Sequence, residues 1–389
     1  MTSGSPLSGV DNVINRCGLG TFSYLPRDVN RDSATGHGSS TRHPERARPA
    51  YNPSLLIPQW SHQIVPTTPP ASPLDAGRIR VDRPLRPVPF PSPRPWAGSR
   101  LAPGTGGIGE LWLAGPDLPV DTGAGVMTLD DVAAAVGEPF LGMRPMALLG
   151  RRFPLIVKLI DAADWLSLQV HPDDALAVEL YGPGALGKTE AWLVLDADPD
   201  TRLVTGPALV LDEAALRSRI AAGTLGRDDC EERDAVPGDV LLLEAGTLHA
   251  VGGGAFVYEI EQPSDITFRI SDWGRQAAPG RTLHLAEALR AVNPAAHAVP
   301  AGHDWRIDGG GLVVREFRLE LEQLRGPVTR RPAGRSLEVV TAIGAPVAAS
   351  GDGWAITLDP WETAVIPAAI PEYRLGGELG AMACVGSIP

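Results

Sequence analysis

Short apolar runs separated by glycine and proline dominate the chain from residue 79 onward. Five of these runs have the short period and the flanking turn residues that predict β-strands. They are 109–115, 163–171, 190–197, 238–246 and 254–262. A helical period is confined to three further stretches, 129–136, 211–223 and 283–293. The pattern predicts an all-β-dominated fold, a sandwich or barrel that carries a few helices.

A second strand-rich stretch follows residue 300 and contains a weak internal repeat. A shift of 123 residues lays 237–249 over 360–372, two copies of strand, turn and strand with the same apolar rhythm. The second copy has Glu372 where the first has His249. We interpret the repeat as a second, metal-free β-barrel-like unit stacked on the first. Chance similarity between two hairpins is the alternative.

Residues 1–78 have no sustained period and are rich in proline, serine and arginine. The first hundred residues carry a formal charge of +6, whereas the whole chain carries −12, so the remainder carries −18. This composition predicts that 1–78 is a disordered basic extension.

The acidic overall balance, with a pI near 5.2, argues against a protein that binds nucleic acid by neutralising phosphates. Three widely spaced cysteines exclude a disulfide framework and a cysteine-based zinc site. The chain has no apolar run of about 18 residues and its first residues do not resemble a secretory signal. We therefore expect a cytoplasmic protein with no membrane partner.

Polar residues alternate along the predicted strand that ends at His171. Alternation places Ser167, Gln169 and His171 on one face, which is costly to bury unless something binds there. Glu190 and His249 follow later in the chain. Two histidines, one glutamate and an amide oxygen suit zinc or a similar divalent ion, with a position left for water or substrate. Histidines that are merely buried or exposed side chains are the alternative.

The segment 259–275 adds acidic and basic residues in a β-period run. Asp265 and Arg269 are four residues apart, so we expect them on one strand face, where Arg269 could bind a phosphate or stabilise negative charge on oxygen. A structural ion pair is the alternative. The chain has 32 arginines but only two lysines, Lys158 and Lys188, and lysine offers a compact donor that arginine cannot replace.

The spacing of glycines and histidine in 238–249 resembles the second metal motif of the cupin barrels, with Glu244 where proline is usual. From about residue 84 to the C-terminus, and most strongly over 153–284, the chain resembles the type I phosphomannose isomerases (mannose-6-phosphate isomerases) in their short bacterial form. The segments that carry the resemblance are PRPWAGSRL, GIGELW, RFPLIVKLIDA, SLQVHPDD, LGKTEAWLVLD, PGDVLLLEAGTLHAVGGG and YEIEQPSDITFRISDWGR. One departure is Ala97 before Gly98, where relatives commonly have two glycines.

The resemblance implies a cupin (jelly-roll) barrel that binds one zinc ion per subunit. The residues it implies are the metal ligands His171, Glu190 and His249 with Gln169 as a fourth in some relatives, the active-site Arg269, the substrate-contacting Lys188, and Ser167 and Asp265 near the site. On this reading, 79–295 forms the metal-binding cupin catalytic domain with helical insertions, and 296–389 forms the C-terminal β domain.

The activity that the resemblance implies is an aldose–ketose isomerisation, which interconverts mannose 6-phosphate and fructose 6-phosphate through a cis-enediolate. Its partner would be a small-molecule phosphosugar. Lys188, Asp265 and a metal-bound hydroxide all remain open as the base. Other readings are a cupin that acts on a different phosphosugar, an iron cupin oxygenase, and a non-catalytic cupin that binds hexose phosphates. The sequence gives no indication of the oligomeric state.

Overall fold

The computed structural model describes residues 78–104, 107–275, 281–301 and 311–389. The predicted extension 1–78 lies outside the described residues, except for its last position. Within these ranges the chain forms antiparallel β-sheets and six α-helices. No helix there is long and apolar enough to cross a membrane. The all-β-dominated class predicted from the sequence is confirmed.

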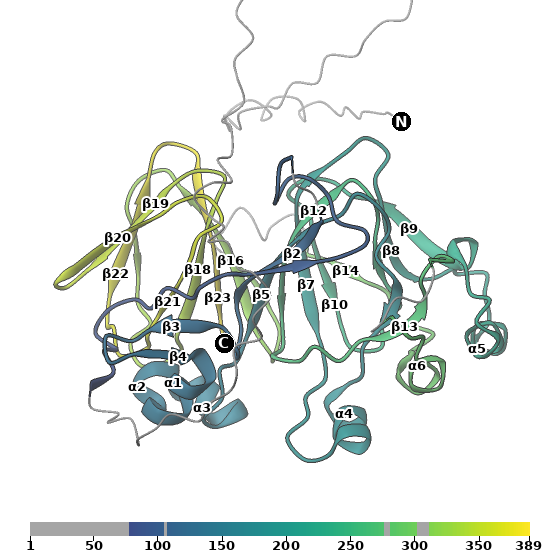
Figure 1. Ribbon diagram of the computed structural model, residues 1–389, viewed down its shortest axis with the longest axis horizontal. Coiled ribbons are helices and arrows are strands. Elements are labelled where there is room, and N and C mark those ends of the chain that lie inside the picture. Colours follow the sequence, from purple (N-terminus) through teal and green to yellow (C-terminus); the bar gives the residue numbers. More distant parts are fainter. Residues whose placement is uncertain (1–77, 105–106, 276–280, 302–310) are drawn as a thin grey trace, which may run out of the picture. The chain divides into compact units, whose positions relative to one another are not determined.

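The part of the chain that carries the predicted metal ligands forms three sheets (Figure 1). The largest has the order β1-β2-β5-β12-β7-β10-β14, and the others are β11-β8-β9 and β13-β6. Their strands are β1 (Phe90–Pro93), β2 (Ile108–Ala114), β5 (Ile156–Asp161), β6 (Leu168–Val170), β7 (Glu190–Ala197), β8 (Arg202–Pro207), β9 (Cys230–Asp234), β10 (Val240–Leu243), β11 (Ala250–Val251), β12 (Ala255–Glu261), β13 (Phe268–Ser271) and β14 (Val299–Pro300). Every residue of β5 and β12 is buried, which is typical of central strands covered on both faces.

The C-terminal strands form a five-stranded sheet, β15-β16-β23-β18-β21, and a four-stranded sheet, β17-β22-β19-β20. Their strands are β15 (Leu312–Val313), β16 (Arg318–Leu324), β17 (Val328–Arg330), β18 (Glu338–Ile343), β19 (Val347–Gly351), β20 (Trp354–Leu358), β21 (Thr363–Ile366), β22 (Tyr373–Gly377) and β23 (Ala381–Ser387). Buried and exposed residues alternate along β19, so one face of this strand packs on the core. A separate hairpin joins β3 (Pro119–Asp121) and β4 (Val126–Thr128).

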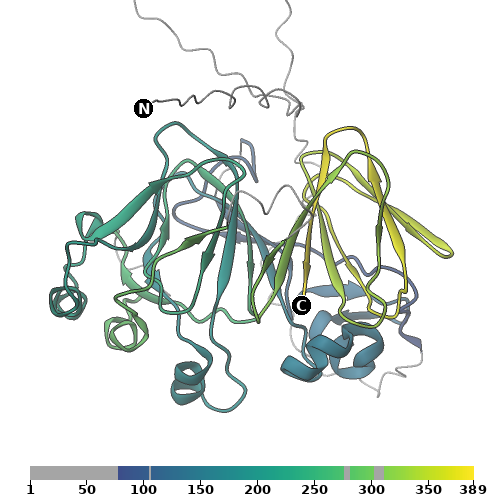
Figure 2. The same ribbon diagram turned by 180° about the vertical axis from the view of Figure 1, so that it is seen from behind.

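The helices are α1 (Leu129–Val136), α2 (Glu138–Leu141), α3 (Met143–Leu149), α4 (Asp174–Tyr181), α5 (Glu213–Ala222) and α6 (Leu285–Ala291), with a short 3₁₀ turn at Arg227–Asp229. A capping box begins α1, because Thr128 Oγ1 accepts from the backbone N–H of Asp131 at 3.0 Å and the Asp131 carboxylate accepts from that of Thr128. Both ribbon views place α1–α3 beside the C-terminal strands (Figures 1 and 2). Met143 N donates to Gly334 O at 2.9 Å at this contact.

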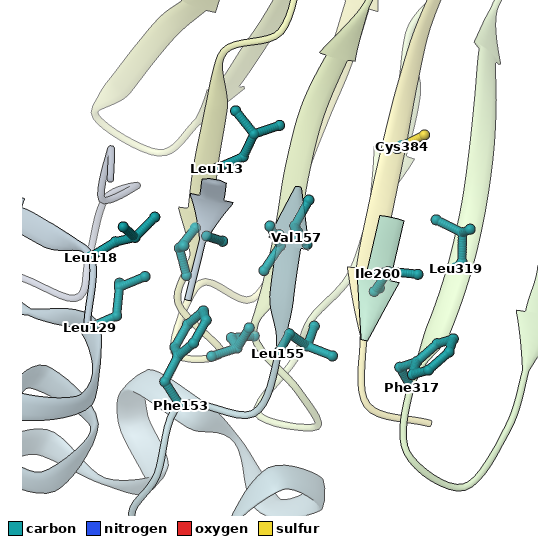
Figure 3. Packing of buried hydrophobic residues seen from close by; sticks show 14 of the residues in the cluster. Leu113, Leu118, Leu129, Phe153, Leu155, Val157, Ile260, Phe317, Leu319 and Cys384 are labelled. Atoms are coloured by element: carbon teal, nitrogen blue, oxygen red, sulfur yellow. The ribbon is translucent and has the colours of Figure 1, made fainter. Parts of the chain in front are cut away.

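One buried apolar cluster joins the large sheet to the five-stranded sheet (Figure 3). Leu113, Val157 and Ile260 come from β2, β5 and β12, whereas Leu319 and Cys384 come from β16 and β23. A Cβ atom on Gly386 of β23 would lie 2.8 Å from Ile260 Cδ1, so the two sheets approach closely there. The expected division between 79–295 and 296–389 stays a prediction, since the described residues of both segments share this core.

The apolar pattern located most elements but misjudged one strand. The bounds predicted for β7 and α1 match the structure, and those of β2, β10, β12, α5 and α6 differ by a few residues at their ends. The prediction of a strand over 163–171 is wrong for its first half, where only 168–170 is a strand. The backbone before it bonds to two separate segments rather than to one ladder: Ala163 N donates to Trp96 O at 2.8 Å and Leu166 N to Val251 O at 2.9 Å.

The internal repeat corresponds to real strands. A shift of 123 residues carries β10 onto β21, both four residues long and fully buried. Glu372, at the repeat position of His249, lies 2.9 Å from Arg331 in an ion pair. The interpretation of two stacked barrels stays a prediction.

Candidate metal centre and adjoining cavity

Three of the predicted ligands come together at the N-terminal end of β7, an internal strand of the large sheet. His171 follows β6, Glu190 begins β7 and His249 precedes β11. His171 Nε2 lies 3.3 Å from Glu190 Oε2, and His249 Nε2 lies 3.4 Å from Glu190 Oε1. All three side chains are buried, with at most 2% of any of them exposed.

Backbone pairing brings these separate segments together. Gln169 and His249 exchange two backbone hydrogen bonds of 3.0 Å, and Gly246 N donates to His171 O at 2.9 Å. Gly246 has a φ of +90°, so the turn that leads to His249 uses a conformation that favours glycine. A glycine-bearing turn therefore leads to His249, and it is hydrogen-bonded directly to His171.

Hydrogen bonds to carbonyl groups orient both imidazole rings. His171 Nδ1 donates to Ile266 O at 2.9 Å, and His249 Nδ1 donates to Thr247 O at 2.8 Å. A ring that donates from Nδ1 presents the lone pair of Nε2, here toward Glu190. Burial, followed by the charge of Lys188, lowers the pKa of His171 to about 3, and burial also lowers the pKa of His249. Both rings are therefore neutral near pH 7.

The donor set fits a divalent cation. His171 Nε2 and Glu190 Oε1 are buried without a hydrogen-bond partner, whereas Glu190 Oε2 has an ion-pair contact with Lys188 Nζ at 3.0 Å. Lone pairs that face one another at 3.3–3.4 Å repel unless a cation lies between them. Two imidazole nitrogens and a carboxylate are ligands that zinc commonly takes. The three residues can hold a metal ion.

Gln169 and Ser167 extend this group, as the alternation of the strand predicted. Gln169 Nε2 lies 3.2 Å from His249 Nε2, and Ser167 Oγ lies 3.4 Å from Gln169 Oε1. The amide therefore donates to the ring nitrogen that would bind the metal. Its Oε1 would have to turn toward the ion for Gln169 to become a fourth ligand.

Both lysines of the chain lie beside this group. Lys188 Nζ is 3.0 Å from Glu190 Oε2 and 2.8 Å from Glu261 Oε2, and Lys158 Nζ is 2.7 Å from Glu261 Oε1. A further contact places Lys158 Nζ 4.3 Å from the centre of the Trp112 ring. Burial lowers the pKa of Lys188, but Glu190 and Glu261 outweigh it and hold this pKa well above its usual value. A lysine that acts as a general base requires a lowered pKa, whereas the pKa of Lys188 is raised.

A cavity of about 560 Å³ opens next to the triad. Ser167, Gln169 and Lys188 line it. Its cationic lining residues are Arg94, Lys158, Lys188, Arg269 and Arg281, and its acidic ones are Glu110, Glu259 and Asp265. The positive side chains thus outnumber the negative ones on the wall of the cavity.

Arg269 and Asp265 both face this cavity but do not share a strand. Arg269 is on β13, whereas Asp265 lies in the loop between β12 and β13, so the prediction of one strand face is wrong. Pro263 explains the break, because it has no N–H to continue the ladder of β12. Asp265 is 63% exposed, and its carboxylate lies 3.9 Å from Lys158 Nζ.

The Arg269 side chain is held by a backbone carbonyl. Its Nη1 donates to Thr282 O at 3.0 Å, and its Nε is buried without a partner. Burial, followed by the charge of Arg281, lowers the pKa of Arg269 from its usual value. Asp272 accepts hydrogen bonds from Arg281 and Arg275. These contacts gather positive charge around Arg269, where an anion would be stabilised.

The sequence pattern did not assign a role to the individual carboxylates of β12. Glu259 and Glu261 are two residues apart, hence on one face of a strand that is buried throughout. Trp192 Nε1 donates to Glu259 Oε1 at 2.9 Å. Two charged residues in alternate positions of an otherwise apolar strand were the available signal. The only sequence signal for Lys158 is the rarity of lysine in this chain.

The departure at Ala97 and Gly98 is compatible with the loop. A Cβ on Gly98 would lie 2.1 Å from Asp161 Oδ1, so glycine is required there. Asp161 is fully buried and accepts from the backbone N–H groups of Arg100 and Leu101 at 2.5 and 3.0 Å. This anchors the segment that carries Trp96, a residue of the cavity wall.

Several known proteins that are described as mannose-6-phosphate isomerases are similar to this chain. No family model matches the chain. The mannose-6-phosphate isomerase of Streptococcus mutans is 40% identical over 154 residues, which are 38% of this chain and 47% of that protein. The probable mannose-6-phosphate isomerase GmuF of Bacillus subtilis is 41% identical over 149 residues, 37% of this chain and 45% of that protein. The predicted resemblance to the mannose-6-phosphate isomerases is confirmed.

The sequence match spans about half the length of these relatives. Solved structures extend the likeness at the level of the fold. The mannose 6-phosphate isomerase of Bacillus subtilis matches with a TM-score of 0.65 and 24% identity over 78% of this chain and 99% of that one. A mutant phosphomannose isomerase of Salmonella typhimurium matches with a TM-score of 0.62 and 15% identity over 78% and 98%. The described β-sheets and helices therefore have the arrangement of mannose-6-phosphate isomerase structures.

Proposed function

We propose that this protein is a metal-dependent isomerase that interconverts mannose 6-phosphate and fructose 6-phosphate. The observation that carries the proposal is the buried group of His171, Glu190 and His249, whose possible ligand atoms converge beside a cavity with more cationic than acidic side chains on its wall. The similarity to mannose-6-phosphate isomerases supports the choice of substrate and reaction.

We propose zinc as the ion and His171, Glu190 and His249 as its ligands, with Gln169 as a possible fourth. When bound, such an ion would supply a Lewis acid for the oxygens on C1 and C2 of the sugar. We also propose that the sheets around it close a cupin barrel. The finer division into a catalytic domain, 79–295, and a C-terminal β domain, 296–389, belongs to the same proposal, as does the cytoplasmic location.

The side chains of the cavity would bind and orient the sugar phosphate. Lys188 and Arg269, both on the cavity wall, would hold anionic oxygens, and Ser167 would donate to a hydroxyl group. Because the body of the chain is strongly acidic, a doubly negative substrate must be held by these few placed cations and not by long-range attraction. Arg269 would stabilise negative charge as it develops, since a guanidinium stays protonated while it does so.

Proton transfer between C1 and C2 requires a base, for which Lys188 and Asp265 are the candidates among the protein's own residues. Lys188 Nζ lies between two carboxylates and would act as a base only when an ion on Glu190 offsets one of them. Asp265 is largely exposed at the cavity wall, where its carboxylate could reach a bound sugar. Loss of the base should abolish the incorporation of solvent deuterium at C2, which we would compare in Lys188→Met and Asp265→Asn.

A coupled assay for fructose 6-phosphate, combined with metal analysis, tests the proposal. Purified protein should turn over mannose 6-phosphate, lose this activity on chelation and regain it when zinc is added. Turnover of a different phosphosugar would replace the substrate, and iron-dependent oxygen consumption would replace the reaction. Binding of hexose phosphates without any turnover would support a sensor instead. A chain shortened to 79–389 should keep full activity if 1–78 takes no part in catalysis.

A further inference from the structure

The two lysines of this 389-residue chain meet at one carboxylate. Glu261 Oε1 lies 2.7 Å from Lys158 Nζ, and Glu261 Oε2 lies 2.8 Å from Lys188 Nζ. Glu261 is fully buried, and each lysine side chain is only 4% exposed. Each oxygen of the carboxylate therefore binds a different ammonium group, in a chain that uses arginine almost everywhere else.

The strand register brings two buried carboxylates opposite each other, which would cost free energy if the lysines were absent. Glu261 on β12 is directly opposite Glu190 on β7, and both are fully buried. Like charges in facing positions of two strands repel. Lys188 lies between them, 3.0 Å from Glu190 Oε2 and 2.8 Å from Glu261 Oε2.

Lys158 enters from the other side of the same strand. It faces Glu259 across the β5–β12 pair, and its Nζ is 3.5 Å from Glu259 Oε2. Glu261 thus links ammonium groups that come from two different parts of the chain. Lys188 in turn contacts Glu190, so the linkage continues to the proposed metal ligand.

Stability alone does not account for Glu261. A well-packed apolar side chain is often as stabilising as a buried ion pair, because burial of charged groups costs free energy. Lys158 Nζ lies within 3.5 Å of the carboxylates of Glu259 and Glu261, and Lys188 Nζ lies within 3.0 Å of those of Glu190 and Glu261. Both lysines line the cavity. Each ammonium group is thus flanked by two carboxylates and also borders the space that a ligand would occupy.

We propose that Glu261 is a positioning residue, which fixes Lys158 and Lys188 relative to each other and to Glu190 so that both ammonium groups address the ligand in the cavity. The expected effect of Glu261 on turnover rests on the proposed isomerase function. The expected effect of Glu261 on the positions of the two lysines is independent of that function.

Glu261→Gln is the variant that tests this role. The amide has nearly the same shape, but its oxygen can accept from one lysine while its NH₂ group faces the other. In the isomerase assay kcat should fall about 10- to 100-fold, as expected when oriented charge in an active site is lost. KM should change less than about threefold, and the zinc content should stay at that of the wild type. Glu261→Asp, which keeps the charge, should recover part of kcat.

Lysine-selective labelling provides a readout that does not depend on activity. Protein labelled with [¹³Cε,¹⁵Nζ]-lysine contains two labelled side chains, which Lys158→Arg and Lys188→Arg would assign. Glu261→Gln should shift the signals of both lysines. The matched control is Glu338→Gln, because Glu338 is also a buried carboxylate, paired with Arg330 in the C-terminal sheets. It should leave both signals unchanged.

The outcomes separate the two proposals. If the wild type has no isomerase activity but Glu261→Gln shifts both lysine signals, the positioning role is supported and the proposed function fails. If the wild type is active and Glu261→Gln keeps its kcat and both signals, the positioning role is overturned. If Glu261→Gln fails to fold, kcat and the two lysine signals are measured in Glu261→Asp instead. The carboxylate of aspartate is shorter by one methylene group, so it cannot hold both lysines in place. Unchanged signals and kcat in Glu261→Asp would overturn the proposal.

Discussion

Replacing Lys188 with methionine removes the ammonium group that lies between two buried carboxylates. Lys188 Nζ is 3.0 Å from Glu190 and 2.8 Å from Glu261, and methionine has a similar length without the charge. Two lysines and three glutamates, the third being Glu259, give this buried cluster a formal charge of −1 before any metal binds. The substitution changes that charge to −2 and leaves Glu190 facing Glu261 without a cation between them.

The expected cost follows from the burial of both partners. Breaking a fully buried ion pair by removing one partner costs about 3–5 kcal/mol, because the remaining charge is left uncompensated. For a folded body of about 300 residues, each kcal/mol changes Tm by roughly 2 °C. We therefore expect the metal-free variant to unfold about 6–10 °C below the metal-free wild type.

Metal binding should reverse part of this loss. A site with one more negative charge attracts a divalent cation more strongly, and a ligand that binds the folded state raises Tm. Thermal unfolding followed by fluorescence, with chelator or with zinc, should show a larger zinc-induced rise in Lys188→Met than in the wild type. Arg330→Met is the control. Arg330 is a partly buried partner of Glu338 in the C-terminal sheets, so its loss should lower stability without a change in the zinc response.

Two results would refute this reasoning. One is a metal-free Lys188→Met protein that unfolds within about 2 °C of the wild type, which would mean that the ion pairs contribute little. The other is a zinc-induced rise no larger than that of the wild type, which would mean that the charge of Lys188 does not act on the metal ligands.

Three further predictions concern pH, catalysis and packing. Burial lowers the pKa of His171 from 6.5 to about 3, so below about pH 6.5 this histidine takes up a proton in the unfolded chain but not in the folded metal-free protein. The free energy of unfolding should therefore fall as the pH drops from about 6.5 toward 3. An acid titration by circular dichroism that shows no loss of stability over this range would contradict the prediction. Arg269→Ala should lower kcat/KM by about 100-fold, whereas a change of only a few fold in steady-state assays would exclude its assigned role. Gly98→Ala should destabilise the protein by about 1–3 kcal/mol in urea unfolding, because its Cβ would lie 2.1 Å from Asp161 Oδ1; a stability equal to the wild type would show that the loop can move aside.

Local sequence determined the elements and most of the residue types at the site. A short apolar run located β7 and a helical period located α1, both at their observed bounds. Such patterns depend only on residues that are close together in the chain. The polar face of the segment before His171 pointed to the same group of residues that the structure assembles. Even the break before Asp265 had a local cause, since Pro263 ends the ladder of β12.

Only the tertiary structure decided how charge is arranged inside the protein. Glu261 meets Glu190, Lys158 and Lys188 because the strands β5, β12 and β7 are neighbours in one sheet with a fixed register. The partners of Glu261 are between 71 and 103 residues away in the chain, and a shift of one residue in register would turn each side chain to the other face. Sequence pattern therefore identified the residues that could bind a metal and a phosphate, whereas the pairing of distant strands determined which charges compensate one another.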